Sequence, residues 1–137
     1  MRNIPLMTKN SAPSVLVVDD EALIRWSLAE TLGEQGYAVT EAGDARMAVA
    51  AIETAAHPFD VVLLDYRLPD SADLRLLEKV RRLAPTSQVI LITAHSSPEL
   101  AQGAAALGAY QVISKPFEVE SLAALVNQAR RDAVKLA

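Results

Sequence analysis

A short apolar segment that ends on a carboxylate limits the folds open to this chain. Residues 61–64, Val-Val-Leu-Leu, form an unbroken apolar run that is too short to be a helix of its own. Such a run is typical of a strand buried on both faces, as in a parallel sheet. Asp65 follows directly, and the chain then enters a loop that contains Pro69. Because ligands of open α/β sheets bind beyond the carboxyl ends of the strands, we expect Asp65 to face a binding site.

The rest of the chain alternates between short apolar runs and helical patterns. Strands are expected at residues 15–18, 37–42, 59–65, 89–92 and 110–114. Helices are expected at residues 22–35, between Asp44 and His57, at residues 73–84, from Ser97 to Gly108, and from Val119 onward. This alternation with short loops predicts right-handed βαβ units and one α/β domain built on a parallel sheet.

The spacing of apolar residues also predicts which side chains pack inward. Leu28 and Leu32 are expected on the inner face of the first helix, and Met47 and Ala48 on that of the second. Trp26 and Tyr37 are interpreted as packing residues rather than ligand contacts.

Composition and charge exclude several classes of protein. No apolar run approaches the roughly 20 residues of a membrane span, and the N-terminus lacks a signal-peptide pattern. The chain has no cysteine, which excludes disulfide and thiolate chemistry and favours a cytoplasmic location. A formal net charge of -4 argues against direct nucleic-acid binding by this domain.

Side chains capable of chemistry follow four of the five expected strands. Asp19 and Asp20 follow the first, Asp65 the third, Thr93 the fourth and Lys115 the fifth. Because parallel strands all point the same way, these side chains should converge at one edge of the sheet. Three neighbouring carboxylates repel one another, and one lysine cannot balance them, so a divalent cation is expected, with oxygen ligands favouring Mg²⁺. Mg²⁺ beside a carboxylate, an ammonium and a hydroxyl indicates phosphoryl chemistry, with Asp65 as a candidate nucleophile.

Four motifs lie at these strand ends: Val17-Val18-Asp19-Asp20-Glu21, Leu64-Asp65-Tyr66-Arg67-Leu68-Pro69, Ile92-Thr93-Ala94 and Lys115-Pro116-Phe117. In this order and spacing the chain resembles the receiver domain of bacterial two-component response regulators, over about residues 15–130. Thr93-Ala94-His95 and Gly108-Ala109-Tyr110 resemble the receivers attached to enhancer-binding transcriptional activators. The resemblance implies a flavodoxin-like (βα)5 fold, with a five-stranded parallel sheet in the order 2-1-3-4-5 and helices on both faces.

The resemblance also implies a function. Asp65 would accept a phosphoryl group from a sensor histidine kinase in the presence of Mg²⁺, and the domain would act as a phosphorylation-dependent signalling switch. It would be no enzyme beyond its own phosphorylation and dephosphorylation. It would work alone or as the input domain of a transcriptional regulator.

The resemblance assigns roles to the residues around Asp65. Asp20 and Asp65 would bind Mg²⁺ directly, together with the backbone carbonyl of Arg67, and Asp19 would act through water. Lys115 would pair with the phosphoryl group. The Lys115–Pro116 peptide bond would be cis, which costs little before proline and directs the lysine inward.

Other residues would transmit or limit the signal. Thr93 would swing to bond the phosphoryl group, and the small Ala94 would leave access to it. His95 is interpreted either as a gate against water attack or as an exposed loop residue. The family usually has an aromatic switch residue three positions before the lysine, where this chain has Val112. Either Tyr110, expected on the same strand face, substitutes in part, or the signal depends on Thr93.

The ends of the chain and one loop residue complete the expectations. Residues 1–14 are interpreted as a disordered leader, and residues 131–137 as a helical extension or the start of a linker. Asp73 stands where the family commonly has glycine and is interpreted as a helix cap. A homodimer through the helix that begins at Ser97, the strand 110–114 and the last helix is also considered, whereas no membrane partner is expected.

Three other functions stay open from the sequence. A flavin- or nucleotide-binding protein of this fold needs a hydroxyl- and glycine-rich loop after the first strand, where the acidic residues 19–21 would repel a phosphate. A receiver that works by docking without phosphate is compatible with the two departures from the family pattern. A hydrolase with an acidic nucleophile usually carries a two-aspartate signature, which is absent because Tyr66 and Arg67 follow Asp65.

Overall fold

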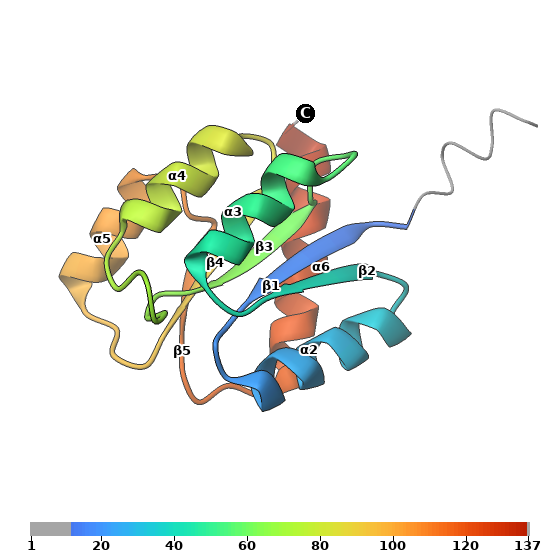
Figure 1. Cartoon of the computed structure of the whole chain (residues 1–137), viewed down its shortest axis with the longest axis horizontal. Coiled ribbons are helices and arrows are strands. Elements are labelled where there is room, and N and C mark those ends of the chain that lie inside the picture. The colour runs from blue at the N-terminus through green and yellow to red at the C-terminus, as the bar shows by residue number, and fades with distance from the viewer. Residues whose placement is uncertain (1–11, 137) are drawn as a thin grey trace, which may run out of the picture.

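The computed structural model describes residues 12–136 and contains a parallel five-stranded sheet in the order β2-β1-β3-β4-β5 (Figure 1). The strands are β1 (Ser14–Val18), β2 (Ala38–Ala42), β3 (Val61–Asp65), β4 (Gln88–Thr93) and β5 (Gln111–Ser114). The helices are α2 (Ala22–Glu34), α3 (Ala45–Thr54), α4 (Arg75–Leu83), α5 (Pro98–Ala106) and α6 (Val119–Leu136). This confirms the predicted flavodoxin-like topology.

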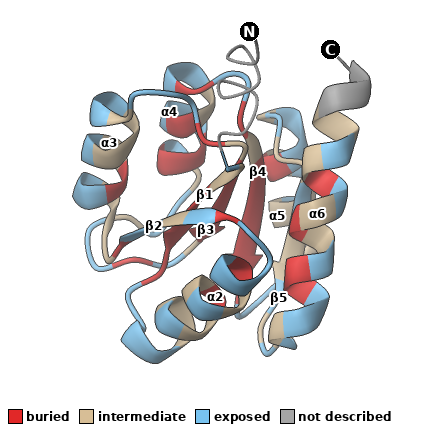
Figure 2. Ribbon diagram, turned by 90° about the vertical axis from the view of Figure 1, so that its right-hand side faces the viewer, coloured by how far each residue is buried: buried red, intermediate tan, exposed pale blue. Residues whose placement is uncertain are grey.

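Two apolar clusters lie on opposite faces of the sheet, as alternation along a strand requires. Leu16 and Leu64 face the side covered by α3, α4 and α5, whereas Val17 and Leu63 face α2 and α6. The central strands β1, β3 and β4 are buried along most of their length (Figure 2). Each fully buried aliphatic side chain of this kind contributes about 1.5–3 kcal/mol. The strand ends that carry the polar residues are therefore anchored in a well-buried core.

Local signals set the ends of several helices as predicted. Asp44 caps α3, because its Oδ1 accepts a hydrogen bond from the Met47 N–H (2.8 Å). Ser97 caps α5 by accepting from the Leu100 N–H (3.1 Å). Gly36 and Gly108, with φ of 97° and 94°, follow the ends of α2 and α5 in the left-handed conformation that favours glycine.

Two side chains that were expected to pack inward are exposed. Trp26 is 59% exposed and Met47 is 51% exposed, whereas Tyr37 is buried as expected. The inner stripe of α2 runs through Leu28 and Leu32, and Trp26 lies nearly on the opposite side of the helix from that stripe. Met47 points away from the side of α3 that buries its neighbour Ala48. The predictions that Trp26 and Met47 pack inward were therefore wrong, because each lies off the buried face of its helix.

The element boundaries differ from the prediction at a few places. Ser14 opens β1, and residues 1–11 of the expected leader lie outside the described residues. α4 begins at Arg75, and Asp73 accepts a hydrogen bond from the Arg75 N–H (2.9 Å) without being the residue at the helix cap. α6 continues to Leu136, so the helix extends beyond residue 130. Among the described residues, no helix has the length and apolar character needed to cross a membrane.

Candidate metal and phosphoryl site

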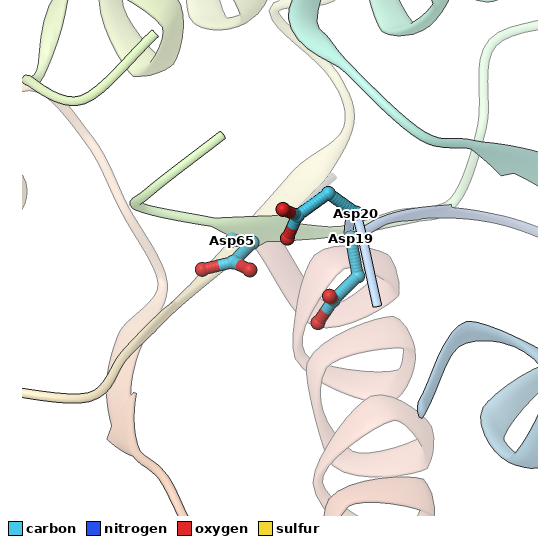
Figure 3. A group of neighbouring side chains, drawn as sticks. All are labelled: Asp19, Asp20 and Asp65. Atoms are coloured by element: carbon cyan, nitrogen blue, oxygen red, sulfur yellow. The ribbon is translucent and has the colours of Figure 1, made fainter. Parts of the chain in front are cut away.

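Three carboxylates meet beyond the carboxyl ends of β1 and β3 (Figure 3). One oxygen from each of Asp19, Asp20 and Asp65 lies within 4.8 Å of the other two. Asp19 and Asp65 are buried, with 1% and 5% of their surface exposed, whereas Asp20 is exposed. The parallel sheet thus brings together the acids that the sequence placed at separate strand ends.

Lys115 enters this cluster from the end of β5. Its Nζ lies 3.0 Å from Glu21 Oε1, 3.1 Å from Asp65 Oδ2 and 3.4 Å from Asp19 Oδ2. Burial lowers the pKa of the Lys115 ammonium, but the bonds to Glu21 and Asp65 outweigh it and raise the pKa above its usual value. The lysine is therefore held charged. The Lys115–Pro116 peptide bond is cis.

The buried carboxylate of Asp19 is only partly neutralised by its neighbours. Its Oδ1 accepts a hydrogen bond from the Glu21 N–H (2.8 Å), but its buried Oδ2 has no hydrogen-bond partner and only the ion-pair contact with Lys115. Burial raises the pKa of Asp19, and the charge of Asp65 adds to this, against the opposing effects of the Glu21 N–H and Lys115. Buried carboxylates are normally paired or bound to a metal. The cluster therefore fits a divalent cation with oxygen ligands.

The loop after Asp65 is held by backbone hydrogen bonds. The Arg67 N–H donates to Asp65 Oδ1 (3.2 Å), and the Tyr66 N–H donates to the Ile92 carbonyl on β4 (2.7 Å). Leu68 and Ser71 form an isolated antiparallel bridge through two reciprocal bonds of 2.7 and 3.2 Å. Arg67 therefore lies between two anchored points, beside the carboxylate.

Thr93 and the residues after it line the open side of the site. A cavity of about 410 Å³ is bordered by Asp20, Asp65, Arg67, Thr93, His95 and Lys115, among others. Thr93 is buried at the end of β4, and its Oγ1 accepts a hydrogen bond from the His95 N–H (3.1 Å). Ala94 and His95 are exposed, so the cavity opens to solvent between them and the acidic cluster. The hydroxyl proton of Thr93 can be donated to a ligand there.

The structure corrects the expected relation between Tyr110 and Val112. Val112 packs with the cluster under α3, α4 and α5, whereas Tyr110 packs with the cluster under α2 and α6. Tyr110 precedes β5, so strand alternation does not apply to it. Its hydroxyl donates to Asp132 Oδ2 on α6 (2.5 Å), and this bond raises the pKa of Tyr110, with burial adding to the effect. The prediction that both residues share a face was wrong.

Two contacts of the site region were missed from the sequence. Glu21 is the residue before α2, a position where short polar side chains usually cap, but its side chain makes no cap bond and instead reaches Lys115. Asp70, in the loop after β3, accepts hydrogen bonds from the first two amides of α3. The run of three acidic residues at 19–21 indicates an acidic site, but it does not predict that Glu21 binds Lys115. No local pattern signals the second, because it depends on how distant segments fold together.

Comparison with known proteins agrees with this geometry. A family model of the response regulator receiver domain matches residues 15–127. The chain is 38% identical over 117 residues to the DNA-binding transcriptional regulator NtrC of Salmonella typhimurium, covering 84% of this chain and 24% of that protein. It is 39% identical over 111 residues to the transcriptional regulatory protein PdtaR of Mycobacterium tuberculosis, covering 79% of this chain and 52% of that protein. The chain thus spans about a quarter of one relative and half of the other.

Solved structures show the same fold. The CheY-like response regulator receiver domain protein of Methanospirillum hungatei JF-1 superposes with a TM-score of 0.86 at 31% sequence identity. The superposition covers 93% of this chain and 100% of that one. The family model, the relatives and the fold therefore agree, and the chain belongs to the response regulator receiver domains, the phosphorylation-dependent switches of two-component signalling.

Proposed function

We propose that Asp65 is the phosphoacceptor of this receiver and that Mg²⁺ is bound directly by Asp20, Asp65 and the backbone carbonyl of Arg67, with Asp19 acting through water. One observation carries this proposal: the buried Asp19 Oδ2 has no hydrogen-bond partner, in a cluster where one oxygen of each of Asp19, Asp20 and Asp65 lies within 4.8 Å of the other two. Because one lysine cannot neutralise three carboxylates, the cluster favours binding of a cation in addition to Lys115. When bound, Mg²⁺ would neutralise charge on the phosphoryl oxygens.

The chain's own residues would perform the transfer. An oxygen of Asp65 attacks the phosphorus of a phosphohistidine, the P–N bond breaks, and the departing imidazole takes up a proton. Lys115, already 3.1 Å from Asp65 Oδ2, would follow the developing negative charge and pair with the transferred group. The domain thereby promotes only its own phosphorylation and later hydrolysis.

Thr93 would convert the chemistry into a change of shape. Its hydroxyl lies at the edge of the same cavity, and the bond that its oxygen accepts from the His95 N–H does not use the hydroxyl proton. A phosphoryl group on Asp65 would attract this hydroxyl, and a shift of Thr93 would carry the loop that leads into α5. Phosphorylation would then favour one of two pre-existing arrangements. The exposed His95 at the mouth of the cavity would limit access of water.

The partners follow from the family and from the names of the relatives. The phosphoryl donor would be a sensor histidine kinase in the cytoplasm. Because NtrC and PdtaR are named as transcriptional regulators, we infer that this domain serves a regulator of the same kind, as its input half or alone. A homodimer through α5, β5 and α6 would carry the output.

A labelling experiment tests the assignment of Asp65. Incubation of the chain with acetyl phosphate should add one phosphoryl group, detected by intact mass, only when Mg²⁺ is present. The Asp65→Asn substitution should abolish the addition, while Asp60→Asn, at the other end of β3, should leave it intact. Labelling that persists in Asp65→Asn would contradict the assignment.

A further inference from the structure

The loop after β3 is fastened at its tip to a helix that lies earlier in the chain. Asp70 Oδ1 accepts a hydrogen bond from the Ala45 N–H (2.8 Å), and Asp70 Oδ2 accepts one from the Arg46 N–H (3.1 Å). These are the first two amides of α3, which have no partner within the helix. The bond from Ala45 lowers the pKa of Asp70, and the Arg46 amide adds to this. Both bonds therefore involve an ionised carboxylate and are stronger than neutral ones.

The segment to which Asp70 is hydrogen-bonded also contacts the backbone of Asp19, on the other side of the acidic cluster. The Ala42 carbonyl, three residues before α3, accepts a hydrogen bond from the Asp19 N–H (3.1 Å). Arg25 strengthens this connection, since its Nη1 donates to the Asp19 carbonyl (2.7 Å) and its Nε lies 3.0 Å from Glu41 Oε1. Residues 41–46 thus contact the backbone around Asp19 at one end and Asp70 at the other.

Hydrogen bonds and burial constrain the loop between Asp65 and Asp70 on both sides of Arg67. Leu68 is 4% exposed and paired with Ser71 through two backbone hydrogen bonds. On the other side, the Arg67 N–H is bonded to Asp65 itself. A shift of Asp70 would therefore displace Arg67, whose carbonyl is a proposed metal ligand.

We propose that Asp70 is a positioning residue for the metal site, because it ties the loop of Arg67 to the same segment, residues 41–46, that holds Asp19. The two sides of the site would then keep the spacing that a divalent cation requires. This inference rests on the proposed function, since it concerns the same Mg²⁺. Partners that orient metal ligands typically change metal affinity by about 10–100-fold when they are removed.

Isothermal titration of the full 137-residue chain with MgCl₂ tests the proposal on four variants. Asp70→Ala should raise the Kd for Mg²⁺ about tenfold, and Asp70→Asn, which keeps one acceptor oxygen, should raise it less. Asp44→Ala removes the other cap of α3 without touching the loop, and Asp73→Ala removes an exposed carboxylate of the same loop. Both control variants should stay within about twofold of the wild type. Amide hydrogen exchange at Arg67 and Leu68 should accelerate in Asp70→Ala even without metal.

The outcomes separate this proposal from the proposed function. If the wild type binds Mg²⁺ and Asp70→Ala binds it equally well, the positioning role is overturned while the metal site stands. If Asp44→Ala weakens Mg²⁺ as much as Asp70→Ala does, fraying of α3 explains the result and the specific role of Asp70 is refuted. If the wild type itself binds no Mg²⁺, the metal part of the proposed function fails and the role of Asp70 fails with it.

Discussion

Glu21, the residue that precedes α2, is bonded to Lys115, 94 positions later in the chain, with 3.0 Å between Oε1 and Nζ. This distance is as short as the 3.1 Å between Lys115 and Asp65. Glu21 therefore competes with the proposed phosphoacceptor for the only cation in the acidic cluster among the described residues. Since Glu21 is exposed and Asp65 is buried, the bond to Glu21 is the one that solvent can replace.

Glu21→Ala should speed the Mg²⁺-dependent labelling of Asp65 by acetyl phosphate. Removing the competing bond frees Lys115 for the phosphoryl group, and a net bond of about 0.5–1.5 kcal/mol corresponds to a rate increase of roughly two- to tenfold. Labelling rates measured by intact mass at saturating Mg²⁺ check this.

Two further variants separate the bond from the charge of Glu21. Glu21→Asp keeps the charge but shortens the side chain, so it should match Glu21→Ala if the bond is what matters. Glu34→Ala, at the exposed end of the same helix, should match the wild type. A wild-type rate in Glu21→Ala would show that Lys115 is not restrained by this contact.

Asp19→Asn should stabilise the metal-free protein at pH 7 by about 1 kcal/mol, because it removes a buried negative charge that Lys115 must share with Asp65 and Glu21. Asp19 has a pKa raised above 3.8 in the folded state. The contribution of Asp19 to stability is therefore greatest below pH 3.8 and is lost as pH rises through the folded-state pKa of this group, so the advantage of the variant should shrink as pH falls toward 4. Urea unfolding in EDTA at pH 4 and pH 7 measures both values.

Magnesium should reverse the order of stability. At saturating Mg²⁺ the wild type should gain more stability than Asp19→Asn, since the variant lacks one carboxylate of the proposed metal site. Asp20→Asn is the matched control in EDTA, because Asp20 is exposed and its charge is already solvated. A destabilised Asp19→Asn in EDTA at pH 7 would contradict the electrostatic account.

Much of this fold could be predicted because its signals are local. Buried runs such as residues 61–64 identify the strands, and Asp44 and Ser97 identify helix starts. The convergence of Asp19, Asp65 and Lys115 followed from the parallel sheet alone, since strand ends at one edge must meet.

The errors and omissions concern properties that only the assembled chain decides. Trp26, interpreted as a packing residue, is exposed because the inner stripe of its helix passes through other residues. Tyr110 was placed by strand alternation although it lies outside the strand. The contact of Asp70 with α3 joins residues 25 positions apart and has no sequence pattern.

Leu23 and Trp26 form an exposed apolar patch on α2, and we expect it to contact the kinase. Leu23 is 76% exposed and borders a cavity of about 540 Å³ that also reaches Lys115, so the patch lies next to the proposed phosphoryl site. Trp26→Ala should slow phosphotransfer from the cognate histidine kinase about tenfold or more, as expected for a tryptophan in an interface. It should leave labelling by acetyl phosphate unchanged, because that donor needs no docking surface.

A second exposed residue provides the control for this patch. Met47 is 51% exposed on α3, away from the cavity, so Met47→Ala should leave both reactions unchanged. Both variants should keep the free energy of unfolding within about 0.5 kcal/mol of the wild type. Equal slowing with kinase and acetyl phosphate would place the effect of Trp26 in the chemistry rather than in docking.

Thr93, rather than Tyr110, should transmit the signal of phosphorylation. The Tyr110 hydroxyl is bonded to Asp132 on α6, and its ring packs on the face of the sheet opposite to Val112 and α5. Tyr110→Phe should therefore lower the free energy of unfolding by about 1–2 kcal/mol through loss of this bond to a carboxylate. Tyr37→Phe, which loses the bond to Asn127, serves as a comparison for stability.

The response to a phosphoryl analogue distinguishes the two candidates. With Mg²⁺ and beryllofluoride, Tyr110→Phe should show the same amide chemical-shift changes in α5 as the wild type, whereas Thr93→Val should lose most of them. The reason is that only Thr93 borders the cavity at Asp65, where its hydroxyl can reach the analogue. Changes in α5 that vanish in Tyr110→Phe but persist in Thr93→Val would assign the signal to the tyrosine instead.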